Sequence, residues 1–154
     1  MDIRVLDPRD AAAAPLLAQS DAYMASLYPA ESNHMESIAG LSRPHVLFLG
    51  AWRDGTLAGC GAVKRMRDAG GDYGEIKRVY VLPAHRGRGI ARTLMTHLES
   101  HLHGHGILLA RLETGISQPE ALALYRALGY VERGPFGAYR LDRYSVFMEK
   151  TLQR

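Results

Sequence analysis

The stretch of sequence that decides the fold is Glu75-Ile-Lys-Arg-Val-Tyr-Val-Leu-Pro-Ala-His-Arg-Gly-Arg-Gly-Ile-Ala91. A run rich in β-branched residues, typical of a strand, ends at Pro83. A basic, glycine-rich turn follows at residues 86–89, and an amphipathic helix is expected to start at Ile90. A strand, a glycine turn and a helix N-terminus together present free backbone N–H groups to an anion. The stretch therefore predicts a site for a ligand that carries a pyrophosphate.

Two well-known phosphate-binding loops do not match this turn. The P-loop pattern Gly-x-x-x-x-Gly-Lys-Ser/Thr occurs nowhere in the chain. The dinucleotide fingerprint Gly-x-Gly-x-x-Gly fails because Gly87-Arg-Gly89 is followed by Ala91 and Arg92 instead of a third glycine. That fingerprint also belongs to the first strand and helix of its fold, whereas this turn lies mid-chain.

The turn instead matches the pattern Arg/Gln-x-x-Gly-x-Gly/Ala, read as Arg86-Gly-Arg-Gly89-Ile-Ala91. In this pattern the chain resembles the acetyl-CoA pyrophosphate loop of the GCN5-related N-acetyltransferase (GNAT) family. Glu75 lies eleven residues before Arg86, at the offset where the histone-acetyltransferase branch has a general-base glutamate. The segment Gln118-Pro-Glu-Ala-Leu-Ala-Leu-Tyr125-Arg-Ala-Leu-Gly-Tyr130 is similar to the family's helix with a catalytic tyrosine. The resemblance covers residues 46–154.

The resemblance implies a set of acetyl-CoA-binding residues. The strand before the turn would offer the backbone groups of Val79, Tyr80 and Val81 to the pantetheine arm. Gln118 stands where the family often has asparagine. The turn and the start of the helix would hold the pyrophosphate through Arg86, Gly87, Arg88, Gly89, Ile90, Ala91 and Arg92.

Tyr125 is the candidate general acid, because the family's tyrosine at this place protonates the departing CoA thiolate. The spacing of Ala121, Tyr125 and Leu128 by itself favours a tyrosine buried in the core. The resemblance favours the catalytic role.

Glu75 is the candidate general base. A carboxylate on an otherwise apolar strand is unusual, because an unpaired buried charge is costly. The alternative interpretation is a structural partner of Lys77 or Arg78. Lys77, together with the more distant Arg43 and Arg140, also hints at a substrate that carries a carboxylate.

The composition bounds the location and the partners of the chain. At 154 residues it is long enough for one domain, residues 1–154, with its own core. A net charge of +3 without a run of basic residues suits a polyanionic cofactor and argues against nucleic acid. A single cysteine, Cys60, fits a reducing compartment. With neither a signal-peptide pattern nor an apolar run of about 18 residues, we expect a cytoplasmic protein without membrane contact.

Local patterns predict a mixed α/β (α+β) order of elements. Strands are expected near residues 3–5, 46–52, 56–66, 73–82, 107–114, 130–133 and 145–152, with helices near 10–27, 33–40, 90–104 and 118–128. Residues 67–71 read as a loop, and Ser117-x-x-Glu120 reads as a capping box. The resemblance implies a mixed, mostly antiparallel twisted sheet of six to seven strands with about four helices. Histidines 97, 101, 103 and 105 read as a solvated helix end, so no metal site is expected.

The conclusion from sequence is an acetyl-CoA-dependent N-acetyltransferase. The acceptor would be a primary amine of a small molecule, which attacks the thioester directly in a ternary complex. The alternatives are a protein or peptide N-acetyltransferase and a catalytically silent acyl-CoA-binding module. The oligomeric state is left open, with a homodimer as one alternative.

Overall fold

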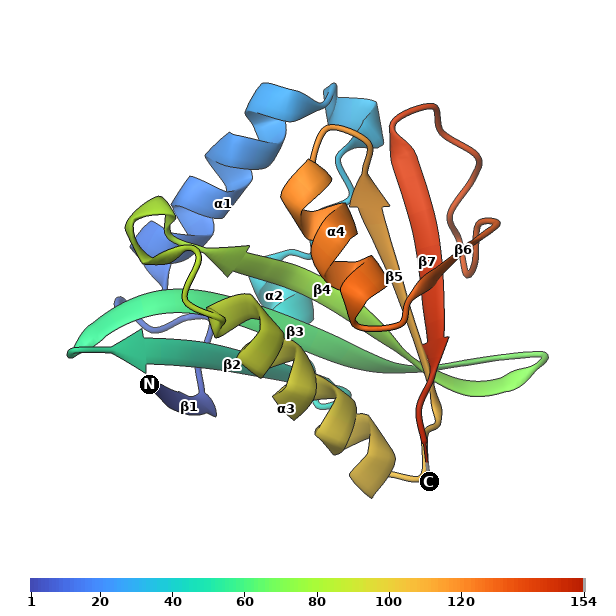
Figure 1. Ribbon diagram of the computed structural model, residues 1–154, viewed down its shortest axis with the longest axis horizontal. Coiled ribbons are helices and arrows are strands. Elements are labelled where there is room, and N and C mark those ends of the chain that lie inside the picture. Colours follow the sequence, from blue (N-terminus) through green and yellow to red (C-terminus); the bar gives the residue numbers. More distant parts are fainter. Residues whose placement is uncertain (154) are drawn as a thin grey trace.

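A seven-stranded sheet forms the centre of the computed structural model, which describes residues 1–153. Its strands are β1 (Asp2–Val5), β2 (Val46–Arg53), β3 (Thr56–Asp68), β4 (Gly71–Val81), β5 (Leu109–Gly115), β6 (Val131–Arg133) and β7 (Ser145–Thr151). They lie in the order β1-β2-β3-β4-β5-β7-β6 (Figure 1). All neighbours are antiparallel except β4 and β5, which are parallel. The expected mixed, mostly antiparallel sheet is confirmed.

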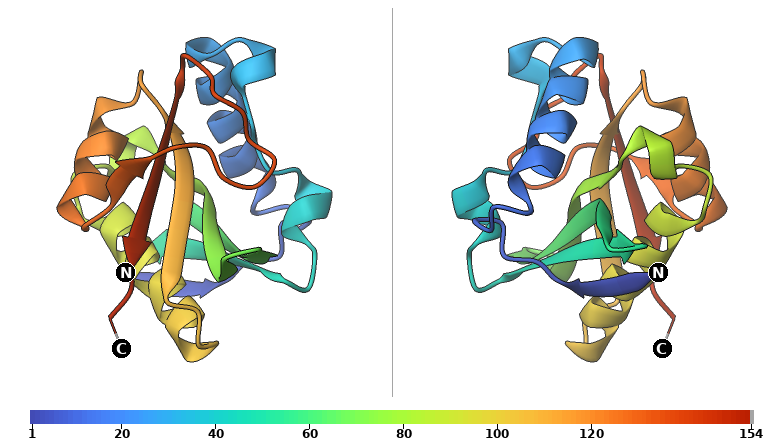
Figure 2. Two further views of the ribbon diagram at one scale, coloured as in Figure 1. Left: turned by 90° about the vertical axis from the view of Figure 1, so that its right-hand side faces the viewer. Right: turned by 90° about the vertical axis from the view of Figure 1, so that its left-hand side faces the viewer.

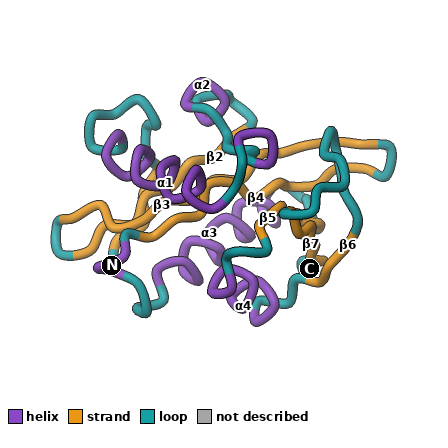
Figure 3. Tube along the Cα trace, turned by 90° about the horizontal axis from the view of Figure 1, so that it is seen from above, coloured by secondary structure: helices purple, strands orange, loops and turns teal. Residues whose placement is uncertain are grey.

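Four α-helices cover the two faces of this sheet. They are α1 (Ala14–Leu27), α2 (Ile38–Leu41), α3 (Ile90–Gly104) and α4 (Pro119–Ala127), and short 3-10 turns lie at Ala30–Ser32 and Pro83–His85. Helices α1 and α2 lie on one face, and α3 and α4 lie on the other (Figures 2 and 3). None of the helices within residues 1–153 has both the length and the apolar character needed to cross a membrane.

The core beneath α3 fixes the position of β4. Leu94, Leu98 and Leu102 repeat at helical spacing on one face of α3, and all three are fully buried against the sheet. Gly74 of β4 faces Leu102 so closely that a Cβ atom there would lie 2.3 Å from the leucine side chain. A larger residue at position 74 would therefore push α3 away from the strand.

The connection between β3 and β4 is tighter than the sequence predicts. Residues 67–71 read as a loop, but Arg67 pairs with Asp72 and Asp68 pairs with Gly71 in the ladder. The Arg67 Nε donates to the Asp72 carboxylate at 2.6 Å across the hairpin, and Gly71 adopts a φ of 121°. The loop prediction was wrong because cross-strand pairing offsets the polar composition of this segment.

Two helices start later than their patterns predict. Helix α1 begins at Ala14 and not at Asp10, because Pro15 belongs in the first helical turn, where its missing N–H costs nothing. The helix expected over residues 33–40 is reduced to α2. Its start is set by Ser37, whose hydroxyl accepts a hydrogen bond from the backbone N–H of Gly40 at 3.0 Å.

Candidate active site

Strands β4 and β5 run side by side over only three residues. Residues Gly74–Ile76 pair with Ala110–Leu112, and beyond this point the two strands diverge (Figure 1). The second half of β4 therefore keeps its neighbour β3 but has no strand on its other edge. Backbone N–H and C=O groups on such an edge are available to an extended ligand.

A β-bulge lies in β4 at the point of divergence. The ladder register shifts there, so that Arg78 and Val79 stand opposite a single residue of β3, Gly61. Arg78 adopts a φ of 60°, which is uncommon for a residue with a side chain. Bulges redirect side chains, and the Arg78 side chain reaches Asp21 on α1.

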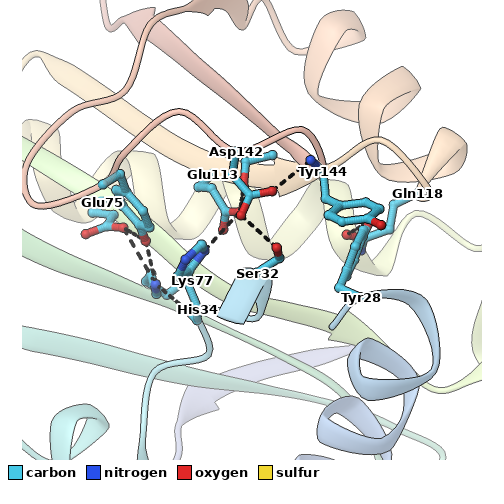
Figure 4. A network of polar contacts seen from close by, with 11 residues as sticks. Tyr28, Ser32, His34, Glu75, Lys77, Glu113, Gln118, Asp142 and Tyr144 are labelled. Atoms are coloured by element: carbon cyan, nitrogen blue, oxygen red, sulfur yellow. Dashed lines mark hydrogen bonds and ion pairs between the residues drawn. The ribbon is translucent and has the colours of Figure 1, made fainter. Parts of the chain in front are cut away.

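A cavity opens where the strands separate. It lies among α1, the segment that follows α1, the outer parts of β4 and β5, and α4. Figure 4 shows polar side chains from these elements and, with Asp142 and Tyr144, from the segment that precedes β7. Its lining includes Tyr28, Arg78, Glu113, Gln118 and Tyr125.

The glycine turn at the end of β4 leaves its backbone open. Gly87 and Gly89 adopt φ values of 76° and 77°, in the left-handed region that glycine favours. A Cβ atom at either residue would meet no protein atom within 4 Å. Gly89 is also the N-cap of α3, so the turn presents unpaired N–H groups at the N-terminus of a fifteen-residue helix. This geometry fits an anion such as a pyrophosphate.

The arginines of the turn differ in their surroundings. Arg86 donates from Nε to the carbonyl oxygen of Val81 at 3.0 Å. Its guanidinium lies 5.6 Å from the Tyr23 ring and 5.5 Å from the Tyr80 ring. Arg88 and Arg92 are exposed, whereas Ile90 is buried and Ala91 is half-buried under the helix. The Arg86 side chain thus turns back onto β4, and the other two arginines surround the turn.

Tyr125 lies on α4 with its side chain buried at the cavity. It is 7% exposed, and its ring packs edge-on against Tyr130 with centroids 5.9 Å apart. Burial raises the pKa of Tyr125 to about 12. The hydroxyl therefore keeps its proton near neutral pH, and this proton is available for donation.

Glu113 is a carboxylate that sequence reasoning missed. It lies on β5 just past the point of divergence, and its side chain is 14% exposed. Ser145 donates a hydrogen bond to Oε2 at 2.9 Å, and His34 Nδ1 lies 3.4 Å from the same atom. Burial raises the pKa of Glu113, although Ser145 and His34 oppose the rise. A buried carboxylate of raised pKa that faces a cavity is suited to accept a proton.

Glu75 lies on β4 before the divergence and outside the lining of the cavity. Its side chain is 6% exposed. Tyr139 donates to Glu75 Oε2 at 2.6 Å, and Lys77 Nζ lies 3.7 Å from that oxygen. Lys77 in turn donates to the Tyr139 hydroxyl at 2.7 Å and to the His34 carbonyl at 2.8 Å (Figure 4). The structure therefore brings Glu75 and Lys77 together, as the alternative interpretation expects, while the catalytic role of Glu75 stays a prediction.

A strand that parts from its neighbour, a bulge, a glycine turn and a helix N-terminus together form a site for an extended, phosphate-bearing ligand. Residues 14–130 match the model of the acetyltransferase (GNAT) family. The chain belongs to the GNAT family. It is therefore an N-acetyltransferase, as the resemblance of its motifs implies.

Individual proteins that are similar to this chain agree with the family assignment. The chain is 44% identical to an IAA acetyltransferase from Azospirillum brasilense, with 94% of each chain covered. It is 34% identical to the N-acetyltransferase YsnE of Bacillus subtilis, with 84% of this chain and 85% of YsnE covered. A crystal structure from Klebsiella pneumoniae, provisionally assigned as an acyl-CoA N-acyltransferase, superposes with a TM-score of 0.82 at 35% identity. That superposition covers 99% of this chain and 97% of the Klebsiella chain.

GNAT enzymes use acetyl-CoA, and the open turn fits the pyrophosphate of that molecule. On the free edge of β4, Val79 belongs to the bulge, and Tyr80 and Val81 continue from it toward the turn. The carbonyl of Val81 is already bonded to Arg86. The remaining backbone groups of this edge are the ones that could pair with the amide groups of a pantetheine arm.

Gln118 is the N-cap of α4, and its side chain is engaged within the protein. Tyr28 donates its hydroxyl proton to Gln118 Oε1 at 3.1 Å, and the same hydroxyl oxygen accepts from the N–H of Ser117 at 3.2 Å (Figure 4). The capping box predicted from Ser117 and Glu120 is absent, because Pro119 at the start of α4 moves the cap to Gln118. Tyr28 thereby ties the end of α1 to the start of α4.

The residues that sequence reasoning missed come from segments distant in the chain. Glu113 and Tyr28 line the cavity, whereas Arg43 and Arg140, expected near the substrate, are exposed outside its lining. Glu113 is a carboxylate among apolar residues, as Glu75 is, but Arg111 two residues earlier makes the pattern equally typical of a solvated strand face. Within residues 1–153, no group of three or more His, Cys, Asp or Glu side chains is arranged to hold a metal ion.

Proposed function

We propose that this GNAT enzyme transfers an acetyl group from acetyl-CoA to a primary amine of a small molecule, by direct attack in a ternary complex. The observation that carries the proposal is that Glu113 and Tyr125 line one cavity, on β5 and α4. A base and an acid that line one cavity suit a reaction that removes a proton from the nucleophile and gives one to the leaving group.

The base acts on the acceptor amine. An amine is protonated near neutral pH, and only its neutral form attacks a carbonyl carbon. Glu113 faces the cavity and its pKa is raised by burial, so its carboxylate is the better placed acceptor of that proton. Glu75 is the second candidate, and it would act through the Tyr139 hydroxyl to which it is bonded.

Acetyl-CoA supplies an acetyl group that is already activated as a thioester. Tyr125 would donate its hydroxyl proton toward the departing sulfur. Gly87 and Gly89 would bind the pyrophosphate through the backbone, supported by the N-terminus of α3 and the exposed Arg88 and Arg92. Gln118 would act on the ligand indirectly, by holding Tyr28 at the rim of the cavity.

The acceptor is proposed to be small because the segment that follows α1 lines the cavity and is held in place by hydrogen bonds. His34 is joined to β4 through the bond from Lys77 to its carbonyl oxygen, and Ser32 is bonded to Asp142 at 2.7 Å. The relative from Azospirillum is named for IAA, a small molecule, which supports this choice.

A CoA-release screen tests the proposal. The purified chain is mixed with acetyl-CoA and with amino acids, polyamines, aminoglycosides or short peptides, and free thiol is followed against a reaction without acceptor. We expect turnover with a small amine, and no acetylated protein in the mass spectrum after incubation with acetyl-CoA alone. Turnover restricted to peptides would overturn the choice of acceptor, and an acetylated protein intermediate would overturn direct attack.

A further inference from the structure

Arg78 is a buried cation with an incomplete set of partners. Its side chain is 2% exposed, and it lies at the β4 bulge on the wall of the cavity. Its Nη1 group donates a hydrogen bond to the Asp21 carboxylate on α1, but the Asp21 side chain is 58% exposed. The Nε–H is buried and has no hydrogen-bond partner among residues 1–153. A buried donor without a partner is unfavourable, so an arrangement of this kind points to a ligand.

The shape of the guanidinium identifies the missing partner. The group is planar, and Nε and Nη2 form one edge that matches the two oxygens of a carboxylate. The bond from Nη1 to Asp21 leaves this edge unused.

The other charged side chains near the cavity have polar partners within the protein. Glu36 pairs with Lys64 at 3.0 Å, and Glu75 pairs with Lys77 at 3.7 Å. Glu113 has His34 and Ser145 beside it. Arg78 is therefore a cavity-lining cation whose carboxylate partner lies mostly in solvent, where ion pairs are weak.

We propose that Arg78 binds a carboxylate of the acceptor, so that the acceptor is a primary amine that also carries a carboxylate. This inference rests on the proposed function. Arg78 comes from β4 and Glu113 from β5, the two strands that diverge around the cavity. The carboxylate at Arg78 holds the acceptor while its amine is directed to the base on the opposite strand.

Matched pairs of acceptors test this specificity. Each pair consists of an amino acid and its carboxamide, for example phenylalanine with phenylalaninamide and methionine with methioninamide, and kcat/KM is measured by CoA release. We expect the wild-type enzyme to prefer the acids. Arg78→Gln should reduce kcat/KM for the acids by about 10- to 100-fold, the usual loss of a hydrogen bond to a charged group. It should change the values for the carboxamides little.

The amino acid and its carboxamide differ in the basicity of their amines. This difference cancels when the acid-to-carboxamide ratio of kcat/KM in the variant is compared with the same ratio in the wild type. Arg43→Gln removes the same charge from an exposed site outside the cavity and should leave the acid-to-carboxamide ratio unchanged. Asp21→Asn provides a second test on an exposed residue, whose side-chain amide oxygen can still accept the hydrogen bond from Arg78 Nη1. It removes the competing carboxylate and should lower KM for the acids alone.

Several outcomes overturn the inference. Equal turnover of acids and carboxamides by the wild type excludes a carboxylate subsite and leaves the N-acetyltransferase proposal intact. Equal losses for both series in Arg78→Gln, with a higher KM for acetyl-CoA, would place Arg78 at the cosubstrate instead. If Arg78→Gln fails to fold, an unchanged KM for the acids in Asp21→Asn decides against the inference. Absence of turnover with any amine would overturn the proposed function itself.

Discussion

Glu75 and Glu113 lie on neighbouring strands of the same sheet, but their surroundings differ. Glu75 stands before the divergence of β4 and β5, where Tyr139 and Lys77 satisfy its carboxylate. Glu113 stands just beyond it, beside the cavity. Glu75 therefore has its partners within the protein, whereas Glu113 faces the cavity, because of where the two strands part.

Replacement of the two glutamates should separate their roles. If Glu113 takes the amine proton, kcat/KM of the wild type rises with pH as Glu113 loses its proton, at a pH above the usual glutamate range because its pKa is raised. Glu113→Gln should abolish this limb and lower kcat/KM by roughly 100-fold or more, since an amide cannot accept the proton. The measurement is a pH profile of kcat/KM for the best acceptor.

Glu75→Gln is the matched comparison, because it makes the same change on the adjacent strand. We expect its pH limb to remain, with a moderate loss of rate through displacement of Tyr139. If Glu75→Gln loses the limb and Glu113→Gln keeps it, Glu75 is the base. Because charge changes at both sites, KM is measured separately from kcat.

The role of the Tyr125 hydroxyl as general acid can be tested by removing it. Tyr125→Phe should lower kcat by roughly 10- to 1000-fold, within and around the usual span for a general acid. Affinity for acetyl-CoA should change little, because the ring still packs against Tyr130. Tyr130→Phe also removes one buried hydroxyl, which is bonded to Glu99 at 2.7 Å away from the cavity. It should affect stability and not kcat, so equal kcat values for the two variants would show that Tyr125 serves only packing.

At the scale of elements, the turn before α3 is the feature on which cosubstrate binding depends. Gly89→Glu should weaken acetyl-CoA binding by about 100-fold, because the new carboxylate would stand a few ångströms from the pyrophosphate, where like charges repel strongly. The substitution meets open space, so the fold should survive with a modest cost from the left-handed backbone of Gly89. Isothermal titration calorimetry with acetyl-CoA measures the change.

Gly106→Glu is the matched control at the other end of the same helix. Gly106 has a φ of 70° and open space around a would-be Cβ, so backbone strain and added charge are the same. Its affinity should equal that of the wild type. Unchanged affinity in Gly89→Glu would remove the turn from the binding site.

The elements themselves follow from local sequence, and this explains how much of the fold could be predicted. The leucine stripe of α3, the Asp54-Gly55 turn between β2 and β3, and Gly129 after α4 are local signals, and the structure confirms each. The loop predicted over residues 67–71 and the capping box predicted from Ser117 and Glu120 were wrong, because cross-strand ion pairing and Pro119 outweigh composition there.

At the scale of the whole molecule, the candidate site depends on contacts between distant segments. Arg111 and Glu113 alternate on β5 as a solvated strand face would, and nothing local shows that β4 moves away from Glu113. The bulge at Arg78 lies at the point where the two strands diverge. The turn could be predicted because its motif is contiguous, whereas Glu113 and the partners of Arg78 could not.

Cys60 offers a test of the folded molecule as one cooperative unit. It is the chain's single cysteine, fully buried between the sheet and α1. Its thiol donates to the Arg78 carbonyl at 3.3 Å. Burial raises its pKa to about 12, so only roughly one thiol in ten thousand is ionised at pH 8 even without steric protection. In the native protein Cys60 should therefore resist a disulfide reagent that labels free cysteine within seconds.

Labelling of Cys60 should begin only when denaturant unfolds the chain. Trp52, the single tryptophan, lies on β2, and the Arg4 guanidinium stands 4.1 Å from the centroid of the Trp52 ring. The fluorescence of Trp52 therefore follows the unfolding of the same sheet. Coincident midpoints for labelling and fluorescence would indicate all-or-none unfolding. Rapid labelling without denaturant would instead mean that α1 separates readily from the sheet. In that case Asp21 would leave Arg78 at the same time, and the wall of the cavity would be mobile in the resting enzyme.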